Sequence, residues 1–392
     1  MVSMQEELTA VPAIAPENGG NGEWEKAALL LSRLSELGFS EVQRFDAPDK
    51  RVPSGKRPNL VVSIPGQSPK PCLWIMSHLD IVPPGDESLW ESDPYRVVRK
   101  DGLLLGRGVE DNQQGLISSI AAALSLRQLG LKPANTVKLL FVADEETSSA
   151  YGIKYLLEHH RLFSKEDMVL VPDGGRPDGD MIEIAEKNLL WLKFQTKGKQ
   201  CHASMPGEGI NAFLAGAELV VKLNELNRLY PDKNPLFHPP NSTFAATKKE
   251  ANVPNINTIP ADDVFYFDCR ILPSIDMEEV LARISEICVS VEEKHGVSTT
   301  VSTVQRLSSP PTPQDSPLVL SLKRALKRVY AVEGKVCGIG GGTVASFLRQ
   351  AGIQTVVWAK LDESAHMPNE YCRIENMVGD AKVMACLMLN RG

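Results

Sequence analysis

Short, almost continuous apolar runs are the feature of this sequence that most constrains its fold. They are NLVVSI (59–64), CLWIMS (72–77), TVKLLFV (136–142) and MVLV (168–171). Consecutive apolar residues are typical of strands covered on both faces, because a strand with one wet face would alternate. A helical pattern at 115–130 separates two of the runs. The sequence therefore predicts an α/β domain with a mixed, largely parallel sheet flanked by helices.

The pattern changes around residue 187, where polar and apolar residues begin to alternate. WLKFQTKG (191–198) and DVFYFDCRI (263–271) both alternate, and helical patterns occupy 212–229 and 277–295. Alternation is typical of an antiparallel sheet with one solvated face and helices on the other. This part of the sequence therefore predicts a separate α+β domain.

The α/β pattern returns after the proline-rich stretch SSPPTPQD (308–315), for example in the apolar run IQTVVW. A chain of 392 residues also exceeds the size at which one hydrophobic core usually stops growing. We therefore expect a larger domain made of residues 1–186 and 306–392, interrupted by an inserted domain at 187–305.

Composition and charge exclude several functional classes. The formal net charge of -7 and the lack of a long basic run argue against a nucleic-acid partner. No apolar stretch approaches the ~20 residues of a membrane helix, and the acidic N-terminus differs from a secretory signal. The seven cysteines are scattered without a CxxC pair, which argues against a disulfide framework and a thiolate zinc site. We expect a cytoplasmic protein whose partner is a small molecule.

A histidine and a carboxylate follow one of the predicted strands. His78 and Asp80 come directly after the run 72–77 and precede a Pro-Pro-Gly turn. A histidine whose ring is held by a nearby carboxylate is a common metal-ligand arrangement. Such a pair by itself is more often a surface pair, or a buried pair whose hydrogen bonds are satisfied within the core.

Four other segments place similar residues near strand ends. They contribute Asp111 in GRGVEDNQQG, Glu145 and Glu146 in FVADEETSS, Asp173 in LVPDGG and His366 in ESAHMPNE. Taken separately, Asp111 or Asn112 is consistent with a helix N-cap, and the consecutive acids with a solvated turn. Taken together, His, Asp and Glu ligands without cysteine are typical of a catalytic zinc, cobalt or manganese centre.

Nine segments of this chain together resemble the M20 metallopeptidases and deacylases, which include acetylornithine deacetylase, succinyl-diaminopimelate desuccinylase and carboxypeptidase G. They are SHLDIVP, GRGVEDNQQG, DEE, PDGG, HASMPGEGINA, NINTIP, DCRILP, GGGT and AHMPNE, in the family's order over nearly the whole chain. The resemblance implies a zinc-peptidase-like catalytic domain and an inserted ferredoxin-like lid through which the chain would form a homodimer.

The resemblance also implies a centre with two divalent metal ions, zinc first, with cobalt or manganese as alternatives. His78, Asp111 and Asp173 would hold one ion. Glu146, His366 and the same Asp111 would hold the other, so that Asp111 bridges ions roughly 3.5–4 Å apart.

Three further residues receive catalytic roles from the resemblance. Glu145 would be the general base, and Asp80 would orient His78. His202 would stabilise the tetrahedral oxyanion, in its own subunit or in the partner's. Without the resemblance, His202 would be taken for an ordinary loop histidine.

The substrate-binding residues implied by the resemblance lie in the predicted insert and just after it. Arg270 and Asn257 would bind a substrate carboxylate, and Thr343 ends a glycine turn beside the substrate. An arginine on an alternating strand is otherwise a residue of the wet face. The chain departs from the common family pattern in the residues NQQG after Asp111 and in Val344 after GGGT. These departures leave the ligands intact and obscure the subfamily.

The expected reaction is hydrolysis of an amide bond in an N-acyl amino acid or a short peptide with a free carboxylate. We favour a deacylase of the acetylornithine deacetylase and desuccinylase type, with a dipeptidase or carboxypeptidase as the alternative. A non-catalytic metal- or amino-acid-binding homologue would be expected to lack the base or a ligand, yet all are present. A dinuclear phosphoesterase would use similar ligands and would not need Arg270 or His202.

Overall fold

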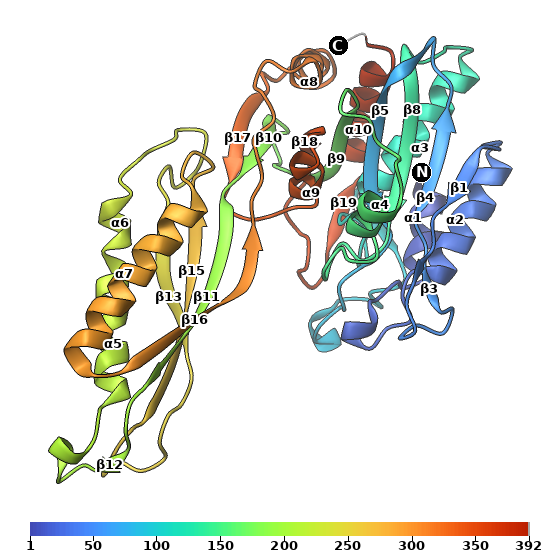
Figure 1. Cartoon of the computed structure of the whole chain (residues 1–392). Helices are drawn as coiled ribbons and strands as arrows, with labels where there is room; N and C mark the ends of the chain where they lie inside the picture. Colours follow the sequence, from blue (N-terminus) through green and yellow to red (C-terminus); the bar gives the residue numbers. More distant parts are fainter. Residues whose placement is uncertain (391–392) are drawn as a thin grey trace. The chain divides into compact units, whose positions relative to one another are not determined.

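The four apolar runs form neighbouring strands of an eight-stranded sheet in the computed structural model, which describes residues 1–390 (Figure 1). These strands are β4 (Leu60–Ile64), β5 (Ser68–His78), β8 (Asn135–Val142) and β9 (Met168–Gly175). The sheet order is β1-β4-β8-β5-β9-β18-β10-β17. The other four strands are β1 (Val42–Arg44), β10 (Met181–Glu186), β17 (Lys335–Ile339) and β18 (Gln354–Ala359).

Four neighbouring strands in the middle of this sheet, β8, β5, β9 and β18, run parallel to one another. Antiparallel pairs, β1 with β4, β4 with β8 and β10 with β18, flank them. Consecutive residues of β5 from Leu73 to Met76 are buried, as expected for a strand covered on both faces. The predicted mixed, largely parallel sheet is thereby confirmed. Because parallel strands end at the same edge, the loops after them converge there.

Helices surround this sheet. They are α1 (Val2–Thr9), α2 (Trp24–Glu36), α3 (Gln113–Gln128), α4 (Ile153–His159), α8 (Pro317–Tyr330), α9 (Ala345–Gln350) and α10 (Ile374–Met388), with 3-10 turns η1 (Pro16–Asn18) and η2 (Glu87–Leu89). Helix α10 packs against α3 and α8, and α3 also contacts β5, β8 and β9. All residues of α3 from Gln113 to Ile120 are buried, so this helix is a rigid support for the loop that precedes it.

Two small antiparallel sheets accompany the large one. β6 (Val98–Lys100), β7 (Leu103–Leu105) and β19 (Tyr371–Arg373) form the first, in the order β19-β7-β6. β2 (Ala47–Pro48) and β3 (Lys56–Arg57) form the second.

The alternating segments form a four-stranded antiparallel sheet in the order β13-β15-β11-β16. Its strands are β11 (Asn188–Lys197), β13 (Thr243–Lys249), β15 (Asp262–Ile271) and β16 (Ser298–Leu307). Helices α5 (Ala212–Asn224) and α7 (Met277–His295) pack on each other, with α5 against β11, β13 and β15 and α7 against β16. The short helix α6 (Leu226–Leu229), the turn η3 (Pro206–Glu208) and the paired strands β12 (Cys201–His202) and β14 (Thr258–Ile259) complete this part.

The chain divides into two compact units. The first comprises Met1–Ile184, Thr312–Cys337 and Phe347–Gly392, and the second comprises Ala185–Pro311 and Gly338–Ser346.

The glycine turn at 338–346, expected in the larger domain, clusters instead with the second unit. The backbone N–H of Gly338 donates to the Leu236 carbonyl (2.6 Å), and Arg270 Nη1 donates to the Gly340 carbonyl (2.8 Å). These two bonds account for the difference from the expected boundary.

Among the residues that the structure describes, no helix combines the length and the apolar character that a membrane crossing requires.

Candidate metal centre

Six of the predicted site residues converge at the carboxyl edge of the four parallel strands. His78 is the last residue of β5, Asp173 lies near the end of β9, and Glu145 and Glu146 follow β8. His366 lies in the loop after β18, and Asp111 lies two residues before Gln113, the first residue of α3. Segments up to 288 residues apart in sequence, from 78 to 366, thus supply one cluster of side chains.

Asp111 lies between the two histidines of this cluster. Its Oδ1 is 2.9 Å from His78 Nε2, and its Oδ2 is 3.1 Å from His366 Nε2. The Nε2 atom of His366 also lies 3.1 Å from Glu146 Oε2. The two oxygens of one carboxylate therefore face two different ligand sets, which is the geometry that a shared ligand requires.

Asp173 and Glu145 gather on the His78 side of Asp111. His78 Nε2 lies 3.6 Å from Asp173 Oδ1. One ligand atom each from His78, Glu145 and Asp173 lie within 4.8 Å of one another, as do atoms from His78, Asp111 and Glu146. Each group of three therefore contains a histidine nitrogen and two carboxylate oxygens.

Asp80 makes different contacts from those expected. The Nδ1 atom of His78 is 3.0 Å from the main-chain carbonyl of Asp80 and 3.6 Å from its carboxylate. The carboxylate accepts hydrogen bonds from the backbone N–H groups of Glu145 (3.1 Å) and Glu146 (2.9 Å). Asp80 thus holds the His78 ring through its main chain and the Glu145–Glu146 turn through its side chain.

Asn112 is a residue of the centre that sequence reasoning considered only as a helix cap. It makes no side-chain capping bond in α3. Its Nδ2 donates instead to Asp173 Oδ1 (2.6 Å) and to the Pro172 carbonyl (2.9 Å). A Cβ atom on Gly115 would lie 2.5 Å from that carbonyl, so the close approach of α3 to β9 requires glycine there. Gly115, the last residue of GRGVEDNQQG, was the sequence signal available for this close approach.

The charges of the cluster explain why cations fit it. Burial raises the pKa of Glu145 well above its usual value, and Asp173, Glu146 and Asp111 add to that effect. Hydrogen bonds to Asp111 and Glu146 raise the pKa of His366 to about 10. The raised pKa values of His78 and His366 show that positive charge is favoured beside these carboxylates. Divalent cations would supply that charge, and the His, Asp and Glu donors suit zinc, cobalt or manganese.

The other predicted residues belong to the second unit. His202 and Asn257 are exposed on the β12 strand and on the loop before β14, and His202 Nδ1 lies 2.7 Å from Ser204 Oγ. Arg270 is partly buried, with its Nε 2.7 Å and its Nη2 3.0 Å from the two Asp268 oxygens. Thr343 Oγ1 donates to Glu186 Oε1 (2.6 Å), in the same unit.

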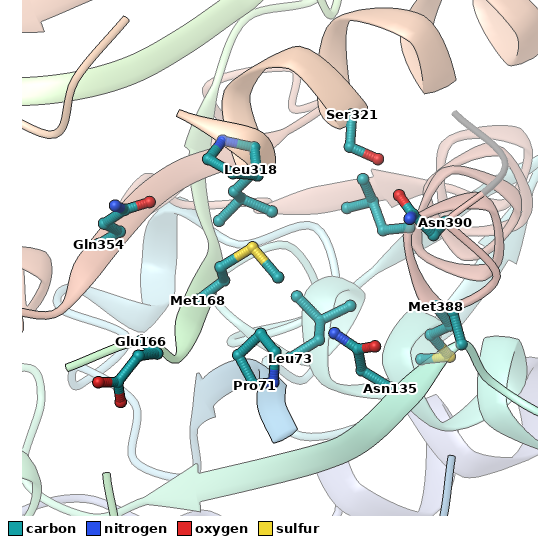
Figure 2. A pocket seen from close by; sticks show the side chains of 13 residues that line it. Pro71, Leu73, Asn135, Glu166, Met168, Leu318, Ser321, Gln354, Met388 and Asn390 are labelled. Carbon is teal, nitrogen blue, oxygen red and sulfur yellow. The ribbon is translucent and has the colours of Figure 1, made fainter. Parts of the chain in front are cut away.

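A separate pocket of about 270 Å³ lies at the opposite end of the parallel strands, near the first residues of β9 and β18 (Figure 2). Leu73, Met168 and Leu318 line it together with polar side chains such as Asn135 and Gln354. Its lining includes one carboxylate, Glu166, and no histidine, so it lacks the set of ligand atoms found in the candidate metal centre.

Comparisons with known proteins agree with this geometry. Residues 74–390 match peptidase family M20/M25/M40. An uncharacterized metallohydrolase of Methanococcus maripaludis is 39% identical over 97% of both chains, and succinyl-diaminopimelate desuccinylase 2 of Shewanella loihica is 26% identical over 97% of both. The crystal structure of aminopeptidase PepT from Bacillus cereus superimposes with a TM-score of 0.80 at 21% identity, covering 99% of this chain and 97% of that one. That likeness shows the fold.

Proposed function

Because the chain belongs to peptidase family M20/M25/M40 and is a metal-dependent hydrolase, we propose that it hydrolyses an amide bond in an N-acyl amino acid or a short peptide with a free carboxylate. The single observation that carries this proposal is the position of Asp111 between two histidines, 2.9 Å from one and 3.1 Å from the other. Glu145 lies half-buried beside His78 and Asp173, and we propose that it acts as the base and not as a ligand.

His78, Asp111 and Asp173 would hold one metal ion, and Glu146, His366 and Asp111 would hold the other. When bound, such ions polarise a carbonyl and lower the pKa of water. Zinc is the expected ion, with cobalt or manganese as alternatives.

Glu145 is placed to act as the general base. Its carboxylate accepts a proton from the attacking water and returns that proton to the nitrogen of the leaving amine. The hydrogen bonds from its own backbone and that of Glu146 to the Asp80 carboxylate hold the turn still during both transfers. The raised pKa of Glu145 suits this role, because a base must bind the proton before it can return it.

The second unit supplies recognition in this proposal, as a lid through which two copies would form a homodimer. Arg270 binds the substrate carboxylate, and Asp268 keeps the plane of its guanidinium in one orientation. His202 donates to the developing oxyanion through Nε2, because its Nδ1 is already bonded to Ser204. Asn257 and Thr343 contact the same substrate.

Two observations bear on the choice between deacylase and peptidase. Relatives at 26% and 25% identity over most of the chain are named succinyl-diaminopimelate desuccinylases, which favours a deacylase. Structures that share the fold include a human carnosine dipeptidase and a carboxypeptidase from Sulfolobus solfataricus, so a dipeptidase or carboxypeptidase is the second candidate. We further propose that the enzyme acts in the cytoplasm on metabolites of amino acids.

The test is release of primary amine from a panel of N-acetyl, N-succinyl and N-carbamoyl amino acids and dipeptides, with release of phosphate from a phosphate monoester measured in parallel. Chelator-treated protein is assayed with and without zinc, cobalt or manganese. Metal-dependent turnover of one acyl class is the expected result, and turnover of dipeptides alone would assign the enzyme to the peptidases. Phosphate release, or two bound ions without turnover of any substrate, would overturn the proposal.

A further inference from the structure

Two buried glutamates join the loop of Asp111 to the loop of His366. Glu110 immediately precedes Asp111, and Glu370 ends the segment AHMPNE that contains His366. Both side chains are buried, with residue exposures of 2% for Glu110 and 0% for Glu370. The proposed reaction assigns neither of them a role.

Glu110 binds the backbone of the opposite loop. Its Oε1 accepts a hydrogen bond from the backbone N–H of Asp362 (2.6 Å), which is 252 residues away in sequence. Its Oε2 accepts from the backbone N–H of Ser364 (2.5 Å) and from Ser364 Oγ (2.7 Å). Ser364 lies two residues before His366, so this carboxylate sets the position from which the ligand loop reaches the cluster.

Glu370 makes the reciprocal contacts. Its Oε1 accepts from the backbone N–H groups of Glu110 (2.9 Å) and Asp111 (3.1 Å). Its Oε2 accepts from the backbone N–H of Gly108 (2.9 Å) and from Arg107 Nη1 (2.7 Å). The backbone N–H of Asp111, the residue shared by both ligand sets, is therefore held from the His366 loop.

The His366 loop needs such external support. Glu363, His366 and Asn369 all have left-handed backbone conformations, with φ of 61°, 64° and 59°. This conformation is uncommon for non-glycine residues, although His and Asn adopt it more readily than Glu, and three such residues in one loop are favoured by contacts that hold the loop. The carboxylate oxygens of Glu110 and Glu370 provide strong, charge-assisted acceptors for backbone N–H groups of both loops.

We propose that Glu110 and Glu370 are positioning residues, a crossed pair of carboxylates that fixes the separation of Asp111 and His366. This inference rests on the proposed function only in taking Asp111 and His366 as metal ligands. Removing either glutamate loosens the opposite loop and weakens metal binding by the folded protein. The function of the two residues is distinct from ligation, because every oxygen of either carboxylate already accepts from the neighbouring loop.

The crossed pattern makes a prediction that needs neither metal nor substrate. In chelator-treated protein, Glu110→Gln should raise amide hydrogen exchange about tenfold or more at 362–364, in the loop that it does not belong to. Glu370→Gln should do the same at 108–111. Glu375→Gln is the matched control, because Glu375 is exposed and lies five residues after Glu370. Faster exchange confined to the mutated loop, or spread over the whole protein, would overturn the proposal.

Metal affinity provides the second measurement. Competition with a chromophoric chelator should show zinc binding about 10–100-fold weaker in either variant, the range typical of residues that orient ligands. The melting temperature of the metal-free variants should fall far less than the affinity does. Activity at saturating zinc should lose kcat with KM unchanged. Lower melting temperatures with wild-type zinc affinity and kcat would mean a purely structural role and would overturn the proposal.

A milder variant keeps the test decisive if Glu110→Gln does not fold. Ser364→Ala removes one donor to Glu110 and should give the same exchange pattern with a smaller increase. If the wild-type protein binds zinc and hydrolyses no substrate, the proposed function fails while the zinc affinities still judge the pair. If the wild-type protein binds no metal, exchange alone decides, and unchanged exchange in all three variants refutes the proposal.

Discussion

The two units of this protein place their charged residues differently. In the first unit, Arg57 is fully buried and pairs with buried Glu23 (Nε to Oε2, 2.6 Å). In the second unit, Glu218 pairs with Lys294 and His295 near the surface, and Arg283 pairs with Glu286 on an exposed helix face. Buried pairs define one geometry at a large desolvation cost, whereas exposed pairs leave side chains free to reorient. In these examples, the buried pair of the first unit fixes one geometry, whereas the pairs of the second unit can reorient.

The sharpest test of the first unit is substitution of its proposed base, Glu145. Glu145→Gln keeps the shape of the side chain and removes its ability to take a proton. We expect kcat to fall by roughly 10²–10⁴-fold, with zinc affinity retained because Glu145 is not a proposed ligand. Steady-state kinetics and chelator competition measure the two quantities. Loss of zinc binding with loss of activity would instead make Glu145 a ligand.

The buried ion pairs of the first unit should contribute more to stability than the exposed pairs of the second unit. Arg57→Met would leave Glu23, Asp49 and Asp144 without the cation that lies within 3.5 Å of each. We expect a loss of about 3–5 kcal/mol in the free energy of unfolding, measured by urea denaturation. Arg283→Met in the second unit is the control and should have a much smaller effect. Equal losses would contradict the comparison.

The exposed histidine of the second unit should matter for catalysis and not for stability. His202→Ala should reduce kcat by roughly 10²–10³-fold, while the urea midpoint stays at the wild-type value because the side chain is exposed. Mixed dimers of His202→Ala and Glu145→Gln subunits then distinguish a His202 that acts in its own subunit from one that acts in the partner subunit. Recovered activity would place His202 in the partner subunit, and a denaturation midpoint lowered by His202→Ala would contradict a purely catalytic role.

Substitution of Arg270 should affect binding more than chemistry. Arg270→Lys keeps the charge but cannot reproduce the planar contacts with Asp268 and a substrate carboxylate. We expect KM to rise by roughly 10–100-fold, in line with about 1.5–3 kcal/mol for hydrogen bonds to charged groups, and kcat to change little. An unchanged KM for substrates with a free carboxylate would remove Arg270 from the recognition site.

The smallest effect is expected at Glu218. Hydrogen bonds from Lys294 and His295 lower the pKa of Glu218 to about 2 from its usual 4.5. Because the folded pKa is the lower one, this contribution to stability is present above pH 4.5 and disappears as the pH falls toward 2. Glu218→Gln should therefore be slightly less stable than wild type at pH 7 and equal to it near pH 2. Thermal melts at both pH values, with and without 1 M salt, check this expectation.

Local patterns predicted much of the fold and several residues of the candidate site. Consecutive apolar residues in 59–64, 72–77 and 136–142 identified buried strands, because a strand covered on both faces has no solvated positions. The histidine and acids after those strands indicated a shared edge, because parallel strands end on the same side of a sheet. Alternation at 191–198 likewise identified the antiparallel sheet of the second unit.

Those local patterns could not predict contacts between segments that are distant in sequence. Periodicity reports which face of an element is buried and carries no information on which backbone N–H a buried carboxylate will meet. The Asp80 carboxylate therefore turned out to hold the Glu145–Glu146 turn, and the glycine turn at 338–346 to belong with Arg270.

The proposed ligands could be predicted from the sequence, whereas the residues that position them could not. His78, Asp111 and His366 could be named from the sequence because each has a side chain suited to a metal and follows or precedes a recognisable element. Glu110 and Glu370 are also carboxylates that could bind a metal. Only the tertiary structure shows that each accepts hydrogen bonds from the backbone of the other's loop. Chain topology decides such pairings, because the partners lie 252 or more residues apart and meet only after the sheet has formed.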